Sequence, residues 1–144
     1  MSRKENKLKG AAAATHQTYR RQSLTHFEDP TVEREVNYIL EEQESLAIKF
    51  EHEESKSGKW ILFVEHASMF SMWKKSCNLY SQGKLEGVTS LKASTAKDNS
   101  RTIVDAYGVI MFHCGPCDDK NLMMHYGKNI VELLSYFNKR GYIP

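Results

Sequence analysis

Apolar residues first recur at a regular spacing after residue 27 of the chain. From Pro30 they fall at every third or fourth position, on one face of a helix: Val32, Val36, Ile39 and Leu40. Asp29 can cap this helix, and Pro30 suits its first turn because the N–H that proline lacks has no partner there. The spacing predicts a helix that begins at residue 30. Residues 1–27 carry almost no apolar periodicity, which predicts a flexible tail.

After residue 45 the apolar residues recur at every second position instead. Apolar and polar residues alternate over 46–53, which predicts a half-buried strand, and the polar tract 54–58 predicts a turn. A second strand over 59–65 follows, so we expect a hairpin. Helical spacing returns after Ser68, in a stripe formed by Met69, Phe70, Trp73, Cys77 and Tyr80. We expect Gly83 to end this helix in the left-handed conformation.

Two more strands are predicted in the second half of the chain, over 86–95 and 102–112. A polar turn over 96–100 separates them, and Gly108 predicts a bulge in the later strand.

The last helix is expected from Asn129, with a buried stripe of Ile130, Leu133, Leu134 and Phe137. Gly141 is expected to end it, and residues 142–144 resemble the start of another strand. Before this helix, residues 113–128 predict a loop with a short helix over 120–125.

The order of elements is therefore tail, helix, strand, strand, helix, strand, strand, helix. This order predicts an α+β fold with a mostly antiparallel sheet and helices packed on one face. A length of 144 residues suits one domain, which we assign to residues 28–144 after a basic tail over 1–27.

Composition narrows the class further. Hydrophobic residues make up 40% of the chain and charged residues 26%, values typical of globular proteins. Apolar runs are a few residues long, far below the roughly 20 of a membrane span, and no apolar signal segment follows the first basic residues. Three cysteines, an odd number, suit a reducing compartment. We therefore expect a protein of the cytoplasm or the nucleus that does not cross a membrane.

Basic residues are concentrated near the N-terminus. Residues 1–22 contain six basic side chains and one acidic, whereas the other 122 residues contain 14 basic and 17 acidic. The six are Arg3, Lys4, Lys7, Lys9, Arg20 and Arg21. This asymmetry predicts an arm that contacts RNA phosphates or an acidic partner.

Cys114 and Cys117 form a Cys-Gly-Pro-Cys motif after an apolar run, the spacing of a thioredoxin-type redox site. Only 27 residues follow Cys117, and Pro144 is the one proline among them, so no cis-proline loop can face the sulfurs. Asp118 and Asp119 add negative charge, which disfavours a thiolate. We interpret the motif as a turn, with dithiol redox chemistry as an alternative.

A structural zinc site is another alternative at this motif. Cys114 and Cys117 would supply half of a tetrahedral site, and the candidates to complete it are His113, His125, Cys77 and His66. Strong zinc motifs carry two paired ligand sets and this chain has one, so we expect no cofactor. The usual nucleotide, hydrolase and metalloprotease motifs are absent, and we assign no catalytic residues.

Four segments together carry a family resemblance: Ser57-Gly58-Lys59-Trp60-Ile61-Leu62-Phe63-Val64, Trp73 on the next helix, Gly83-Lys84-Leu85, and Leu91-Lys92-Ala93-Ser94-Thr95. Over about residues 55–143 the chain resembles the basophilic-leukaemia-expressed protein family. The resemblance implies a curved antiparallel sheet backed by helices, similar to the cap-binding translation initiation factors, and no established activity. In those factors two aromatic rings sandwich a methylated guanine. Trp73 lies on an apolar helical stripe and is expected in the core, and no motif places Trp60 in such a slot.

The hypothesis we favour is a non-enzymatic interaction protein that binds a protein partner through its α+β domain. If a strand is missing after Gly141, the sheet has an open edge that a partner's strand, or a second copy, can complete. The alternative is an RNA-binding module, in which the basic tail contacts phosphates and Trp60, Tyr107 or Tyr126 stacks on bases.

Overall fold

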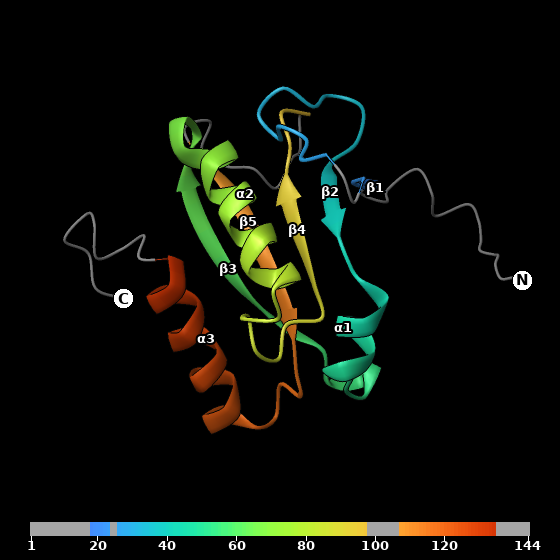
Figure 1. The fold of residues 1–144 in the computed structure, drawn as a ribbon, viewed down its shortest axis with the longest axis vertical. Coiled ribbons are helices and arrows are strands. Elements are labelled where there is room, and N and C mark those ends of the chain that lie inside the picture. The colour runs from blue at the N-terminus through green and yellow to red at the C-terminus, as the bar shows by residue number, and fades with distance from the viewer. Residues whose placement is uncertain (1–17, 24–25, 98–106, 135–144) are drawn as a thin grey trace, which may run out of the picture.

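The computed structural model describes residues 18–23, 26–97 and 107–134, which form an α+β fold (Figure 1). In chain order the elements are β1 (Tyr19–Arg21), β2 (Tyr38–Glu41), α1 (Glu44–Lys49), the short 3₁₀ helix η2 (Glu54–Lys56), β3 (Gly58–Glu65), α2 (His66–Ser81), β4 (Ser90–Ser94), β5 (Tyr107–Cys114) and α3 (Lys120–Leu134). The predicted fold class is confirmed, whereas the order of the elements differs in the first half of the chain.

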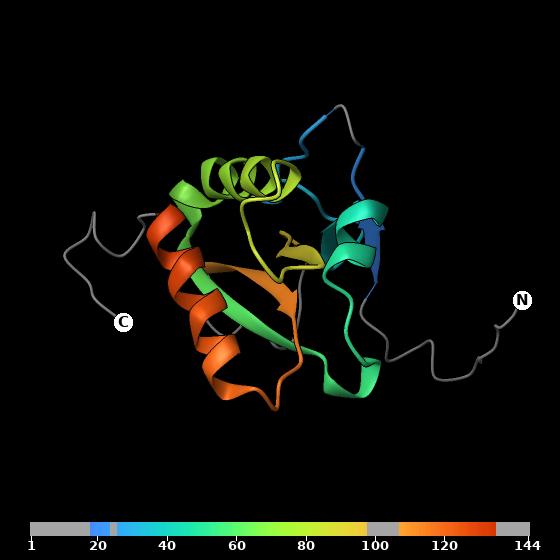
Figure 2. The same ribbon diagram turned by 60° about the horizontal axis from the view of Figure 1, so that its bottom comes forward.

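The strands form one mixed sheet in the order β1-β2-β4-β5-β3. β1 runs parallel to β2, and every other neighbouring pair is antiparallel, so the sheet is mostly antiparallel as predicted. α2 and α3 lie on one face of the sheet, and among the described elements no α-helix lies on the opposite face (Figures 1 and 2). We call that opposite face the open face.

The core lies between the sheet and the helices on its covered face. It includes Ile39, Leu62, Val64, Leu91, Ile110 and Phe112 on strands and Met69, Trp73, Cys77, Tyr80, Ile130 and Leu134 on helices. Burying one large apolar side chain contributes roughly 1.5–3 kcal/mol. The helix predicted after Ser68 is confirmed as α2, although it begins at His66. Gly83 follows it with φ +75°, as expected for a left-handed helix end.

The helix predicted from residue 30 to Leu40 is wrong. Its first residues form a turn in which the Asp29 carboxylate accepts hydrogen bonds from the Thr31 N–H (2.9 Å) and hydroxyl (2.7 Å). Such side-chain bonds satisfy local backbone donors outside a helix. Val32 is 68% exposed, whereas Ile39 is buried as a strand residue of β2 that pairs with β4. Pairing between segments far apart in the sequence therefore overrides the local helical spacing.

The strand predicted over 46–53 is also wrong, because its first part is α1. Leu46 and Phe50 both pack toward the core, and their separation of four residues suits one face of a helix as well as an alternating strand. Ile48 lies between them and is 58% exposed. The predicted hairpin with β3 does not form.

The strand predicted over 86–95 is confirmed as the shorter β4, and the strand predicted over 102–112 is confirmed as β5 from Tyr107 onward, since residues 102–106 lie outside the described residues. Gly108 does not form a bulge, because it faces Val64 in an unbroken register between β5 and β3. A Cβ at Gly108 would lie 3.0 Å from the Met69 sulfur, so this glycine lets α2 pack close to the sheet.

The loop predicted over 113–128 is replaced from Lys120 onward by α3. The short helix expected over 120–125 and the helix expected from Asn129 are parts of one helix. Gly127 lies inside it, where a Cβ would approach the indole of Trp60 to 2.7 Å. Gly127 therefore does not end the helix. Its lack of a side chain leaves room for the Trp60 ring.

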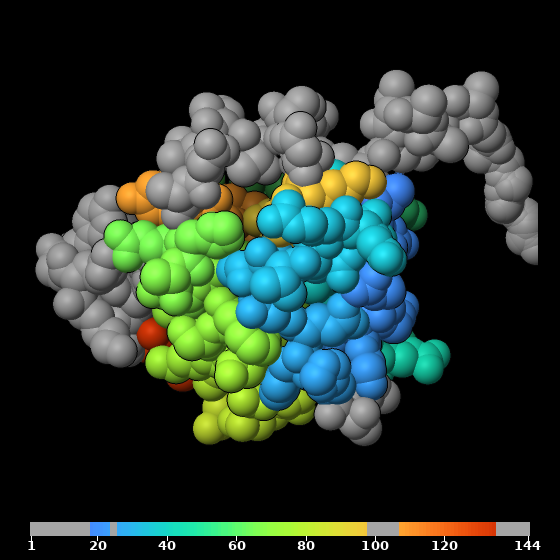
Figure 3. Space-filling model, turned by 90° about the horizontal axis from the view of Figure 1, so that it is seen from above, coloured from blue at the N-terminus to red at the C-terminus, as the bar shows by residue number. Residues whose placement is uncertain are grey.

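Part of the predicted flexible tail belongs to the domain. β1 pairs with β2, and the neighbouring Gln22 is only 3% exposed. Its side chain accepts a hydrogen bond from Trp73 Nε1 at 3.1 Å on α2. Figure 3 shows this N-terminal segment, in blue and cyan, against α2 in green. Several predicted features lie outside the described residues: the tail over 1–17, the turn residues 98–100, the strand residues 102–106, the end of the last helix with Phe137 and Gly141, and the strand start over 142–144.

Candidate binding surface along the β3 edge

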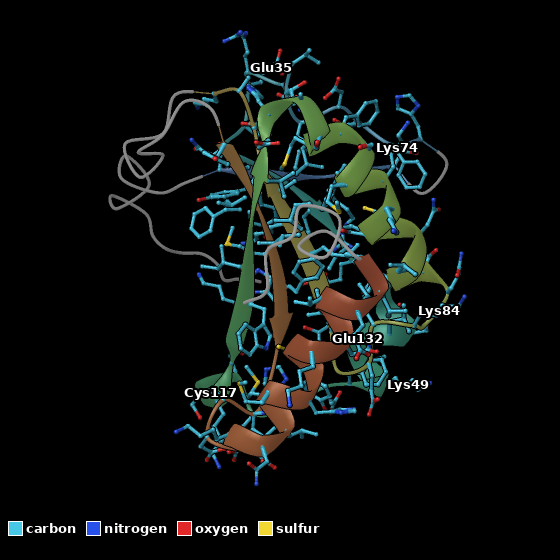
Figure 4. The ribbon with its side chains drawn as sticks, turned by 90° about the vertical axis from the view of Figure 1, so that its left-hand side faces the viewer. Glu35, Lys49, Lys74, Lys84, Cys117 and Glu132 are labelled. Atoms are coloured by element: carbon cyan, nitrogen blue, oxygen red, sulfur yellow. The ribbon has the colours of Figure 1, made fainter. Side chains whose placement is uncertain are left out.

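β3 forms one edge of the sheet. It is eight residues long and pairs with β5 along its whole length, and among the described residues no strand pairs with its other side. Figure 4 views the molecule from this side. The outer side of an edge strand presents N–H and C=O groups that can pair with another strand. β3 contains no proline, and its two charged residues, Lys59 and Glu65, lie near its ends, so the centre of the strand lacks the features that usually protect an edge.

The side chains of β3 alternate between the two faces of the sheet. Leu62 and Val64 are buried on the covered face, whereas Lys59, Ile61 and Phe63 lie on the open face. Ile61 is 46% exposed and Phe63 is 62% exposed. Two large apolar side chains thus lie in solvent beside an unpaired strand edge.

Ile61 and Phe63 were not singled out as binding residues from the sequence. The signal was present, because residues 60–64 are five consecutive apolar residues rather than an alternating pattern. A continuous apolar run is typical of a strand that is covered on both faces.

The open face continues from β3 across the rest of the sheet. On β5 it includes Val109 and Met111, which pair with residues of β3. On β4 the Lys92 Nζ lies 4.9 Å from the centroid of the Tyr19 ring, within reach of a cation–π contact. Burial lowers the pKa of Lys92, and the charge of Lys59 lowers it further. The open face therefore runs from the exposed apolar side chains of β3, past Met111, which is only 8% exposed, to Lys92 and to Tyr19 on the opposite edge strand β1.

Trp60 lies on the covered face of β3 and not on the open face. Its Nε1 donates a hydrogen bond to the carbonyl oxygen of Met123 at 2.9 Å, and its ring lies against Gly127 of α3. The structure therefore places the predicted RNA-stacking indole between β3 and α3. Trp73 is fully buried, which confirms the prediction that it belongs to the core.

Two of the six basic residues near the N-terminus are described, and both are paired with acidic side chains. Arg20 contacts the carboxylates of Glu28 and Glu33, and hydrogen bonds to both raise its pKa. The Arg21 guanidinium lies 3.0 Å from a carboxylate oxygen of Glu42. The other four lie outside the described residues: Arg3, Lys4, Lys7 and Lys9.

The Cys-Gly-Pro-Cys motif connects β5 to α3. Cys114 is buried and burial raises the pKa of its thiol to about 11, whereas Cys117 is exposed. The Cys117 N–H donates a hydrogen bond to the Lys56 carbonyl oxygen at 2.7 Å, which ties the loop to the start of β3. A thiol with a raised pKa is a poor nucleophile at neutral pH. This arrangement disfavours a redox role for Cys114 and suits a turn.

The side chains considered as zinc ligands have separate environments. His125 Nε2 lies 3.2 Å from a Glu86 carboxylate oxygen, and burial lowers the pKa of His113 to about 4, with further lowering by nearby lysines. Within the described ranges, no group of three or more His, Cys, Asp or Glu side chains is arranged to hold a metal ion. The geometry therefore adds no support to the zinc alternative at Cys114 and Cys117.

Comparison of the sequence with protein-family models gives no match, and comparisons with curated proteins and with solved structures give none either. The family resemblance therefore stays a prediction. Of the helices in the described part of the chain, none combines the length and the apolar character needed to cross a bilayer. Fold and surface together define an α+β protein with a mixed sheet. Within the residues that the structure describes, no α-helix covers one face of this sheet, and no strand pairs with the outer side of β3.

Proposed function

We propose that this protein is a non-enzymatic interaction module that binds a protein partner by pairing an extended strand with the outer side of β3. The observation that carries the proposal is an eight-residue edge strand with exposed Ile61 and Phe63. In strand addition, main-chain hydrogen bonds supply affinity and alternate side chains supply specificity. Covering the exposed parts of these two side chains contributes about 2–3 kcal/mol.

Charge on the described surface favours a protein over RNA as the partner. Arg20 and Arg21 are already paired with carboxylates, and Trp60 packs beneath α3. Among the described residues, the lysines on the open face near β3 are Lys59 and Lys92, and burial disfavours the charged form of Lys92. RNA binding through the N-terminal basic residues stays the alternative.

Two further parts of the proposal concern fold similarity and location. The antiparallel strands β2, β4, β5 and β3, with α2 and α3 on one face, support a likeness to the cap-binding translation initiation factors, which stays a prediction. The three cysteines are free, which supports a reducing compartment and hence the cytoplasm or the nucleus.

Affinity purification of the tagged full chain from its own cells tests the proposed function. Three forms are compared: the parent, the double variant Ile61→Lys with Phe63→Lys, and the control Ile48→Lys on α1. Ile48 is 58% exposed and belongs to α1, which lies near β2 rather than at the outer side of β3 (Figure 1), so the control introduces one exposed lysine for isoleucine elsewhere. We expect proteins that copurify with the parent and the control to fall at least about tenfold with the β3 variant, since lysines at an edge oppose pairing.

The proposal is wrong if the same proteins copurify equally with all three forms, or if the tagged parent brings down neither another protein nor an untagged copy of this chain. Loss of the copurifying proteins after ribonuclease treatment would instead support the RNA alternative.

A further inference from the structure

We propose that a second copy of this chain supplies the strand that pairs with β3, in an antiparallel arrangement in which Leu62 faces Leu62 of the second copy. The inference rests on the proposed function, because it requires strand pairing at the same edge. It goes further by naming the partner and the register. The result is a symmetric dimer in which the two sheets form one continuous sheet across the two β3 strands.

Symmetry limits the registers that two identical antiparallel strands can adopt. A two-fold axis between them must be perpendicular to the sheet, so the covered faces of both copies lie on the same side. Residues that face each other across the axis then belong to the same face of the sheet. One residue of β3 must therefore lie at the axis and face its own copy, and the central candidates are Ile61, Leu62 and Phe63.

Charge and shape select Leu62 among these. With Leu62 at the axis, Lys59 faces Glu65 of the second copy, and the same pair recurs on the other side of the axis. Ile61 then faces Phe63 of the second copy, also twice. Opposite charges and aromatic–aliphatic pairs at facing positions are the combinations that stabilise antiparallel strands.

The neighbouring registers lose these pairings. With Ile61 at the axis, Lys59 faces the apolar ring of Phe63 and Glu65 faces a residue beyond the strand. With Phe63 at the axis, Ile61 faces the carboxylate of Glu65, and Lys59 faces residue 67 in the first turn of α2. The arrangement about Leu62 pairs residues 59–65, nearly the full length of β3.

Burial agrees with this assignment. Ile61 and Phe63 are 46% and 62% exposed in the single chain, and in the dimer the four side chains gather around the axis on the open face. On the covered face Leu62 and Val64 are already buried, so little further adjustment of the core is needed. The dimer therefore covers the most exposed apolar side chains of β3 without rearranging the fold.

Light scattering coupled to size-exclusion chromatography of the purified full chain, over a series of concentrations, tests the dimer. We expect the parent to dimerise. Lys59→Glu places two carboxylates opposite each other at both Lys59–Glu65 pairs of the dimer, and we expect about a tenfold or greater increase in the dissociation constant. Glu65→Lys is expected to weaken the dimer similarly, and the double variant with both changes is expected to restore it because the charges are exchanged.

Lys84→Glu serves as the matched control, since Lys84 is exposed and lies away from β3 (Figure 4). It is expected to dimerise like the parent. Glu65 directly precedes α2, so thermal unfolding of each variant is recorded, and Lys59→Glu remains informative if Glu65→Lys unfolds.

A parent that stays monomeric at all concentrations overturns the inference. If its copurifying proteins are nevertheless lost on changing Ile61 and Phe63, the proposed function stands with a different partner. A dimer that Lys59→Glu leaves unchanged, or a well-folded double variant no tighter than the single variants, overturns the register.

Discussion

The side chain of Gln22 connects the N-terminal segment to the core through a set of buried hydrogen bonds. Its Nε2 donates to Glu41 Oε1 at 2.7 Å and contacts the Cys77 sulfur at 3.4 Å. Its Oε1 accepts from Trp73 Nε1 and from the Glu28 N–H, each at 3.1 Å. A buried polar group left without a partner costs about 1–3 kcal/mol, so this amide holds β1, β2 and α2 together.

Glu41 makes stability depend on pH through its position in this cluster. Burial raises the pKa of its carboxyl, although the hydrogen bond from Gln22 opposes that shift. The folded state therefore holds the proton more tightly than the unfolded state. As pH rises above the ordinary glutamate range, near pH 4.5, the unfolded state ionises first and the free energy of unfolding falls.

We therefore expect Glu41→Gln to flatten the decline in stability above about pH 4.5 and to be more stable than the parent at neutral pH. Urea denaturation between about pH 4 and pH 8 measures this difference. Glu33 acts in the opposite direction, because the hydrogen bond from Arg20 lowers its pKa, but it is unchanged in both proteins. A parallel pair of pH profiles would contradict the assignment.

Single residues could be predicted where a local pattern determines their role. The burial of Trp73 follows from a helical stripe, and the left-handed Gly83 follows from its place after a helix. Gln22 and Arg20 had no such signal. Their partners on β2, α2 and the 28–33 segment lie far from them in sequence or outside any periodic element.

At the scale of elements, the segment between α2 and β4 depends on a glycine that packs against α3. Gly87 has φ +84°, and a Cβ there would lie 2.3 Å from the Tyr126 ring. Gly83 also has a positive φ, but a Cβ there would meet nothing within 4 Å. Substitutions at the two glycines therefore distinguish the cost of a left-handed backbone, present at both, from the cost of a packing clash, present only at Gly87.

We expect Gly83→Ala to destabilise the protein by about 1–2 kcal/mol, the effect of a left-handed alanine. Gly87→Ala is expected to cost about 2–5 kcal/mol, because the Tyr126 ring must also move. Urea denaturation of both variants gives the comparison. Equal losses would show that the ring moves aside freely and would contradict the packing argument.

Elements whose apolar spacing fits one type of secondary structure were predictable, and elements whose spacing fits both helix and strand were not. α2 has one clear apolar stripe, and β3 follows a turn and contains mainly β-forming residues. For β2 and α1 the apolar spacing suited both helix and strand. Their outcome depended on pairing with β4 and on packing in the core, neither of which a local window contains.

For the whole molecule, the sequence predicted an open sheet edge because a strand was expected to be missing after Gly141. That segment lies outside the described residues, and the edge of the proposed binding surface is formed by β3. Strand order is a property of the folded sheet, since β3 lies beside β5 and not beside its neighbours in sequence. The exposed Ile61 and Phe63 could have been inferred from the apolar run, but their position at an edge could not.

The central claim is that the outer side of β3 is paired when the protein is bound. Amide hydrogen exchange, resolved residue by residue in the parent at high concentration and in the monomeric Ile61→Lys, Phe63→Lys variant, tests it most directly. We predict protection of all amides over 59–65 in the parent, and alternate amides exchanging at least about tenfold faster in the variant while β5 is unchanged. Alternate β3 amides that exchange equally fast in both proteins, or that are equally protected in both, would contradict it.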